Sequence, residues 1–152
     1  MANAGGAVYG TLVVGIMLAA EDARHEGYPA TFEAASVVLA LYWLMSFYAH
    51  VLGVRLKRRQ PLDRGILWRG CLYELPILEG ALIPFLVLSV AWAAGLTVAR
   101  GVSWALWAAA ATVVALEVLA GWRSGRRFRE LVIQASAGAA MGLALIAVKL
   151  LL

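Results

Sequence analysis

The stretch that decides the fold is residues 31–59, TFEAASVVLALYWLMSFYAHVLGVRLKRR. Before the basic run that begins at Arg55, this stretch carries one carboxylate, Glu33, and one histidine, His50. An α-helix needs about 20 apolar residues to cross the hydrocarbon core of a bilayer, because each residue rises about 1.5 Å through about 30 Å. The stretch therefore predicts a membrane-spanning helix over 31–54 that stops at the cations.

The whole chain has the composition of a membrane protein. Of its 152 residues, 63% are hydrophobic and 14% are charged, whereas soluble domains carry about 25% charged residues. Apolar blocks such as 108–111 (AAAA) lack the alternation of membrane β-strands. We therefore predict an all-α polytopic bundle of five spans in one transmembrane domain, 1–152. The spans are expected at about 4–22, 31–54, 71–95, 101–122 and 130–151.

Turn and capping residues suggest where the spans begin and end. Residues 27–29 (GYP) predict a turn before the second span, with Thr31 as its candidate N-cap. Residues 66–68 (ILW) are expected along the membrane interface before the third span. Gly95 and Gly101 are expected to bracket a short connection between the third and fourth spans.

The 13 Lys and Arg residues predict the orientation. Ten of them lie in 55–70 and 123–129, whereas the other two loops hold only Arg24 and Arg100. Short loops rich in Lys and Arg stay in the cytoplasm, so we expect a cytoplasmic N-terminus and an outer C-terminus in the cell (inner) membrane. Because residues 1–20 lack a basic n-region and an evident cleavage site, we interpret the first span as retained.

The excess of positive charge favours lipid as a partner. The net charge is +4, but the cations flank spans and form no stripe on one face, which argues for anionic lipid and against nucleic acid. The lone cysteine, Cys71, excludes an internal disulfide, and we interpret it as a small buried apolar residue.

Polar groups inside the spans are the candidate functional residues, since a charge at membrane depth is costly and usually faces a protein interior or a water cavity. They come from four spans, all in the half that we place near the cytoplasm. Counted along the helix from the nearest arginine, Glu79 is the deepest, at roughly 15 Å. The candidate ion or proton pathway comprises His50, Glu74, Glu79, Glu117 and Gln134.

Glu79 lies between Pro76 and Pro84. Proline leaves one helical carbonyl without its N–H, and a carboxyl group beside a freed carbonyl is typical of the broken helices of transporters. With His50 and Glu117, Glu79 is a candidate metal site for a divalent cation, or a proton carrier. The alternative is a protonated Glu79 that only locks helix packing through a hydrogen bond across the bundle.

The neighbouring polar residues also have purely structural interpretations. His50 shares a helical face with Trp43 and Ser46, and its place near the headgroups fits a simply interfacial histidine. Glu74 is shallower than Glu79 and is a candidate partner of Arg69 or Arg55.

Two GxxxG patterns predict close helix packing. Gly6 and Gly10 lie in the first span, and Gly138 and Gly142 lie in the last. Because so short a bundle encloses little, we also expect a homo-oligomer.

The order of these features resembles the vacuolar iron transporter family and its small bacterial relatives. The similar parts are residues 80–85 (GALIPF), and the run from Gly121 through Arg126 and Arg127 to the small-residue last span. The resemblance covers about 70–150 and implies a homodimer that exchanges Fe²⁺ or a similar ion for protons, with Glu79 near the path. The chain departs from the family in 55–70, which is short and basic where the family has a Glu-rich metal-binding insert.

A second departure is the first span, where 9–20 contains no acidic residue although the family has one there. Six positive charges also oppose delivery of a cation through the loop 55–70. The resemblance therefore implies the fold without iron transport.

Three functions are ranked on these grounds. The first is movement of a small ion, a divalent cation or a proton, through intramembrane carboxylates; the cofactor is left open, with a divalent cation as the candidate. The second is a non-transporting scaffold or accessory protein that binds a partner or anionic lipid. An intramembrane enzyme is third, because the chain has no evident nucleophile–base pair, so no enzymatic activity is predicted.

Overall fold

A computed structural model describes residues 4–20, 27–58 and 63–123, with 136, 140, 142–144, 146 and 147 near the C-terminus. The elements are α1 (Ala4–Ala20), α2 (Tyr28–Arg58), α3 (Arg64–Ala93) and α4 (Val98–Arg123). Within these residues the secondary structure is helical and contains no strand. The all-α prediction is therefore confirmed for the described part of the chain.

Three of the helices, α2, α3 and α4, are long and apolar enough to cross a membrane. Helix α1 is apolar but shorter, with 17 residues, or about 26 Å at 1.5 Å per residue. Large apolar side chains are exposed along α2, α3 and α4, as expected where lipid replaces water as the solvent. These features are compatible with an integral membrane protein. Most of the expected fifth span, 130–151, lies outside the described residues.

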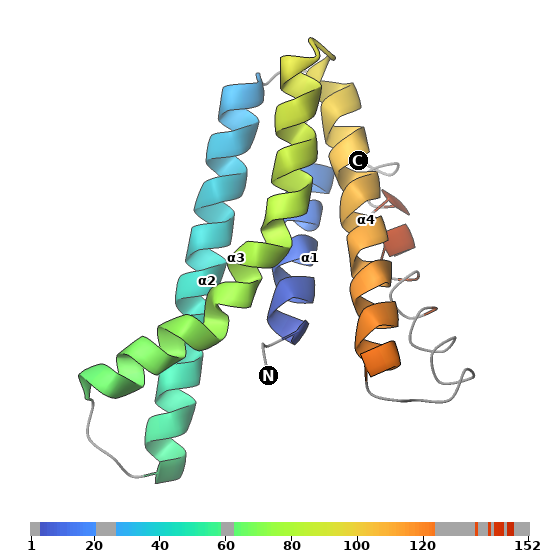
Figure 1. The fold of residues 1–152 in the computed structure, drawn as a ribbon. Helices are drawn as coiled ribbons and strands as arrows, with labels where there is room; N and C mark the ends of the chain where they lie inside the picture. Colours follow the sequence, from blue (N-terminus) through green and yellow to red (C-terminus); the bar gives the residue numbers. More distant parts are fainter. Residues whose placement is uncertain are drawn as a thin grey trace.

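The helices alternate in direction along the chain (Figure 1). The start of α1, the end of α2, the start of α3 and the end of α4 lie at one end of the bundle. The turn from α3 to α4 lies at the other end, where α2 also begins. The end at which α2 stops and α3 begins is therefore the basic one, because Arg55 and Lys57 lie in the last turns of α2 and Arg64 begins α3.

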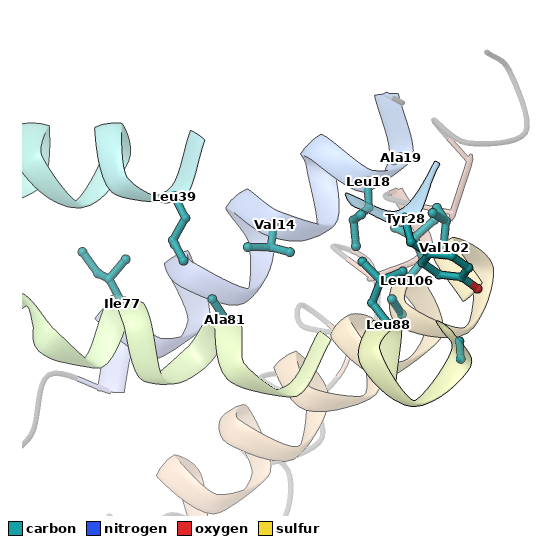
Figure 2. Close-up of a cluster of buried hydrophobic side chains, with 12 residues drawn as sticks. Val14, Leu18, Ala19, Tyr28, Leu39, Ile77, Ala81, Leu88, Val102 and Leu106 are labelled. Atoms are coloured by element: carbon teal, nitrogen blue, oxygen red, sulfur yellow. The ribbon is translucent and has the colours of Figure 1, made fainter. Parts of the chain in front are cut away.

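The core forms where α1 packs against α2, α3 and α4. Its fully buried members include Val14 and Leu18 from α1, Ile77 and Leu88 from α3, and Val102 from α4. Figure 2 shows these side chains as one continuous cluster between the helices. Above the basic end, the interior is thus largely apolar.

Helices α1 and α3 approach each other most closely at two glycines. A Cβ atom on Gly10 would clash with the backbone carbonyl of Ile77, and a Cβ on Gly80 would clash with that of Ala7. Only residues without a side chain allow this approach of the two backbones. Gly10 belongs to the first GxxxG pattern, whose other glycine, Gly6, is also buried.

A hydrogen bond at the same crossing compensates for a proline. Pro84 has no N–H to donate to the carbonyl of Gly80, four residues earlier. The hydroxyl of Thr11 lies 2.8 Å from that carbonyl oxygen and 2.9 Å from the carbonyl of Ala7, and can donate to either. Figure 1 also shows α3 changing direction part-way along its length, which Pro76 and Pro84 inside the helix explain.

The helix ends correct three predictions. Residues 27–29 do not form a separate turn, because α2 begins at Tyr28. Thr31 is not an N-cap; its N–H already donates to the carbonyl of Gly27 within the first turn. Gly101 lies inside α4, where its missing side chain leaves room for the Tyr28 hydroxyl, which donates toward the carbonyl of Leu96.

Two further helix ends follow standard capping chemistry. The third helix starts earlier than predicted, so 66–68 are helical, and the Asp63 side chain caps it by accepting from the N–H of Gly65. At its other end Gly95 has a positive φ of 68°. The N–H of Leu96 donates to Ala91 and that of Gly95 to Trp92, which is a Schellman motif.

Candidate functional site

A buried carboxyl group lies where α3 crosses α2. Glu74 is 5% exposed, and the hydroxyl of Ser46 on α2 donates to its Oε2 at 2.8 Å. Its Oε1 lies 3.5 Å from Nδ1 of His50, one helical turn further along α2. Ser46 and His50 are four residues apart, so they share one face of α2. Both oxygens of the carboxyl group thus have a polar neighbour on the same helix.

The histidine lies at the accessible edge of this site. Its side chain is 29% exposed, whereas that of Glu74 is 6% exposed. Its ring stacks on Tyr73 with a centroid distance of 4.5 Å. Gly70 on α3 lets α2 come close at this point, because a Cβ there would touch three side chains of α2, those of Val51, Phe47 and His50. The imidazole is therefore held between α2 and α3.

Aromatic side chains with polar groups extend the site toward α1. Tyr42 lies one turn before Ser46 on α2, and its ring is 6.5 Å from that of Tyr9 on α1. Trp43 stacks on Phe47 at 5.8 Å, and its buried Nε1 has no hydrogen-bond partner among the described residues. The site therefore contains an unused buried donor on the α2 face that also carries Ser46 and His50.

The structure distributes the predicted pathway residues differently from the hypothesis. His50 and Glu74 come together, but Glu79 is exposed on α3 and Glu117 is half-buried on α4. Gln134 and Gly138 lie outside the described residues. Within the described ranges, no three His, Cys, Asp or Glu side chains gather in a way that could hold a metal ion. The candidate metal set of Glu79, Glu117 and His50 therefore does not form a cluster in the part of the chain that the structure describes.

Two local interpretations also change. The polar partners of Glu74 are Ser46 and His50, and not Arg69 or Arg55, which are both exposed. Cys71 is half-buried, not buried.

Gly142 packs closely against Ala110 of α4, as the second GxxxG pattern predicts for this position.

The sequence did contain the signal for this site. Ser46 and His50 stand on the face of α2 that the helical period defines, together with the buried Leu39. What the sequence did not show is which face of α3 points toward the interior of the bundle. A count of depth along the chain ranked Glu79 above Glu74, but depth does not say which side of the helix points inward. Glu74 and Glu79 are five residues apart, about 140° around the helix.

Comparisons with protein families, with curated proteins and with solved structures find no match for this chain. The resemblance to the vacuolar iron transporter family therefore stays a prediction. The fold and the site together define a small α-helical bundle, compatible with a membrane protein, that holds the buried carboxyl group of Glu74. The chemistry open to that group is to take up and release a proton beside an imidazole, or to hold two helices together.

Proposed function

We propose that this protein is a multi-pass protein of the cell membrane that carries protons or a small cation through a site centred on Glu74 and His50. The observation that supports the proposal most is the pairing of a buried carboxyl group with a partly exposed imidazole 3.5 Å away. Ionisable groups within membrane spans usually mark ion or proton paths. An imidazole can both accept and donate a proton, so His50, at the accessible edge of the site, is suited to connect solvent with Glu74.

A proton fits the site better than a divalent cation. Ca²⁺ takes six to eight oxygen ligands and Mg²⁺ requires a near-octahedral shell. Glu74, His50 and Ser46 offer far fewer ligand atoms, and no third acidic, His or Cys side chain joins them among the described residues. A proton needs only one acceptor and a route to it, which the carboxyl group and the imidazole provide.

The position of the site suggests a direction of access. His50 is on the part of α2 near the basic end of the bundle, and the positive-inside rule places that end in the cytoplasm. Beyond Tyr42 and Tyr9, the apolar cluster around Val14 and Ile77 fills the interior (Figure 2). In this arrangement Glu74 exchanges protons with the cytoplasm, and passage to the far side requires the helices to rearrange around the site.

The rival function is a scaffold, in which the Ser46–Glu74–His50 contacts only fix the crossing of α2 and α3. The observation that favours it is that Glu74 already has a partner at each oxygen. An apolar groove of about 680 Å³ lies between α4 and the described residues near the C-terminus. It is lined by Trp107, Val114 and Leu143 and offers a surface to a lipid chain or an apolar partner.

The test is proton flux into liposomes that contain the purified full-length protein and a trapped pH-sensitive dye, driven by a potassium diffusion potential. We expect the wild type to acidify the lumen faster than protein-free liposomes. Glu74→Gln should reduce the rate to the protein-free value. Glu79→Gln, a matched change on the same helix, should leave the rate unchanged because Glu79 lies on the exposed face.

Two results would contradict transport through the site of Glu74 and His50. The first is a wild-type rate equal to that of empty liposomes over the range of imposed potentials. The second is a Glu74→Gln rate equal to wild type. Thermal unfolding of each variant in detergent serves as the folding control, so that loss of flux is compared only between folded proteins. A folded but inactive wild type, with Glu74→Gln destabilised, supports the scaffold.

A further inference from the structure

Helix α3 consists of two parts that differ in burial. In residues 64–75, which we call the α3 arm, only Gly70 and Glu74 are buried. Large apolar side chains of the arm, such as Leu72 and Leu75, are exposed. The second part of the helix, in contrast, contributes these buried residues to the bundle: Pro76, Ile77, Gly80, Ala81, Pro84, Leu88 and Ala91. The arm is therefore the part of α3 that the apolar core stabilises least.

The second part of α3 is fixed to α1. The two backbones meet closely at Gly10 and Gly80, where a Cβ atom on either residue would clash with the other helix. The hydroxyl of Thr11 lies 2.8 Å from the carbonyl oxygen of Gly80, the acceptor that Pro84 leaves without a helical N–H. Packing and hydrogen bonding thus hold this part of α3 and α1 together as one unit.

The arm contacts α2 instead. Among the described residues, the side-chain hydrogen bonds and ion pairs that join the arm to another helix are those of Glu74 with Ser46 and His50. Tyr73 stacks on the His50 ring, and Gly70 faces the same ring. The contacts that hold the arm in place are therefore the contacts of the candidate site.

A proline separates the two parts. Pro76 has no N–H to donate to the carbonyl of Leu72, four residues earlier, and no side chain in the described part of the chain donates to that carbonyl. Pro84 differs, because Thr11 compensates for it. Helices bend at prolines, and in Figure 1 the arm runs at an angle to the rest of α3. The helix can therefore pivot at Pro76 with little further loss of hydrogen bonds.

We infer that the α3 arm is the inner gate of the site: it pivots at Pro76 and separates from α2, which opens the carboxyl group of Glu74 to the basic end of the bundle. With the arm docked, Glu74 is 5% exposed. The second part of α3 keeps its contacts with α1, so the far side of the site stays closed while the arm is open. A few residues at an element boundary are enough for such a hinge. This inference rests on the proposed function and names the part of the chain that moves.

The movement is tested by double electron–electron resonance on the full-length protein in liposomes, in a Cys71→Ser background. One pair of spin labels joins Trp68→Cys on the arm to Leu44→Cys on α2. The control pair joins Leu86→Cys, on the second part of α3, to the same position of α2; all three residues are exposed. We expect two distances for the arm pair and one distance for the control pair.

A substitution that separates the arm from α2 should change the two populations. Gly70→Leu places a side chain where a Cβ already meets Val51 and Phe47, so the fraction of the longer arm distance should rise by about twofold or more. Gly53→Leu on α2 is the matched control, because nothing lies within 4 Å of a Cβ at that position. It should leave the two fractions unchanged.

The role of the movement in transport is tested by fixing the arm to α2 with a disulfide. A Cβ on Gly70 would lie 3.0 Å from Cγ2 of Val51, so Val51→Cys and Gly70→Cys, combined in the Cys71→Ser background, lie within reach of a disulfide. Oxidation of this double variant should lower proton flux into liposomes by about fivefold or more. Reduction should restore the rate measured before oxidation. Each single cysteine variant, given the same oxidant, should keep its own rate.

Three results would overturn the inference. They are a single arm distance in the protein without a substitution at Gly70, a double variant that forms no disulfide, and an oxidised double variant that transports as fast as its reduced form. The first comparison involves no change at Gly70, so it decides the question even where Gly70→Leu does not fold. A wild type that moves no protons contradicts the proposed function, and with it the gate; the spin labels need no flux and still show whether the arm moves.

Discussion

The hydroxyl of Thr11 on α1 lies 2.8 Å from the carbonyl oxygen of Gly80 on α3, the acceptor that Pro84 leaves without a helical N–H. A proline in one helix is thus compensated by a side chain from another. The two glycines at the same crossing allow the approach. This relationship ties the short helix α1 to the bent helix α3.

Thr11→Val is expected to lower the free energy of unfolding by about 1 kcal/mol, because the buried carbonyl of Gly80 loses its donor. Thr11→Ser keeps the hydroxyl and serves as the control. In a Pro84→Ala background the helix regains its own N–H, so Thr11→Val should cost less there. Thermal unfolding in detergent of the four proteins of this double-mutant cycle measures the coupling. Equal costs of Thr11→Val in both backgrounds would contradict this role.

Gly10→Ala is expected to destabilise the bundle by about 1–3 kcal/mol, as overpacking does, because the new Cβ meets the carbonyl of Ile77. Gly53→Ala is the matched control, since nothing lies within 4 Å of a Cβ at that helical position. Alanine favours the helix over glycine by about 1 kcal/mol, so Gly53→Ala should be neutral or stabilising. A similar effect of the two changes on thermal unfolding would argue against the close crossing.

The sequence predicts the helical class well because the signal is physical and local. A long apolar run such as 31–54 crosses a bilayer as a helix, because a helix pairs every backbone polar group within the segment and the run lacks the alternation of a barrel strand. Helix ends are less predictable. Gly95 ends α3 as predicted, but the cap by the Asp63 side chain was not predicted, and Gly101 was expected at the edge of the connection although it lies inside α4 and makes room for Tyr28.

The candidate site was predictable on α2 and not on α3. Helical periodicity groups Ser46 with His50 without knowledge of a partner helix. On α3, however, the exposed positions are as apolar as the buried ones, because lipid and core favour the same side chains. Hydropathy therefore does not tell the inward Glu74 from the outward Glu79. Only the packing against α1 and α2 distinguishes them.

Ser46→Ala is expected to lower the free energy of unfolding by about 1 kcal/mol, because Oε2 of the buried Glu74 loses its donor. Ser36→Ala, an exposed serine on the same helix, is the control and should have little effect. In a Glu74→Leu background the carboxyl group is gone, so Ser46→Ala should cost less. Unfolding experiments that give the same cost with and without Glu74 would show that the hydrogen bond does not contribute.

The response to metal ions separates a proton site from a cation site. A ligand present at about 100 times its dissociation constant adds about 2.7 kcal/mol to a native state that alone binds it. Because Glu74, His50 and Ser46 offer few ligand atoms, we expect Fe²⁺, Mn²⁺, Zn²⁺, Ca²⁺ and Mg²⁺ to leave thermal unfolding unchanged while proton flux proceeds. A rise in unfolding temperature with one ion, lost in both Glu74→Gln and His50→Gln but kept in Glu79→Gln, would instead assign a cation to this site. The flux assay would then be repeated with that ion as the transported species.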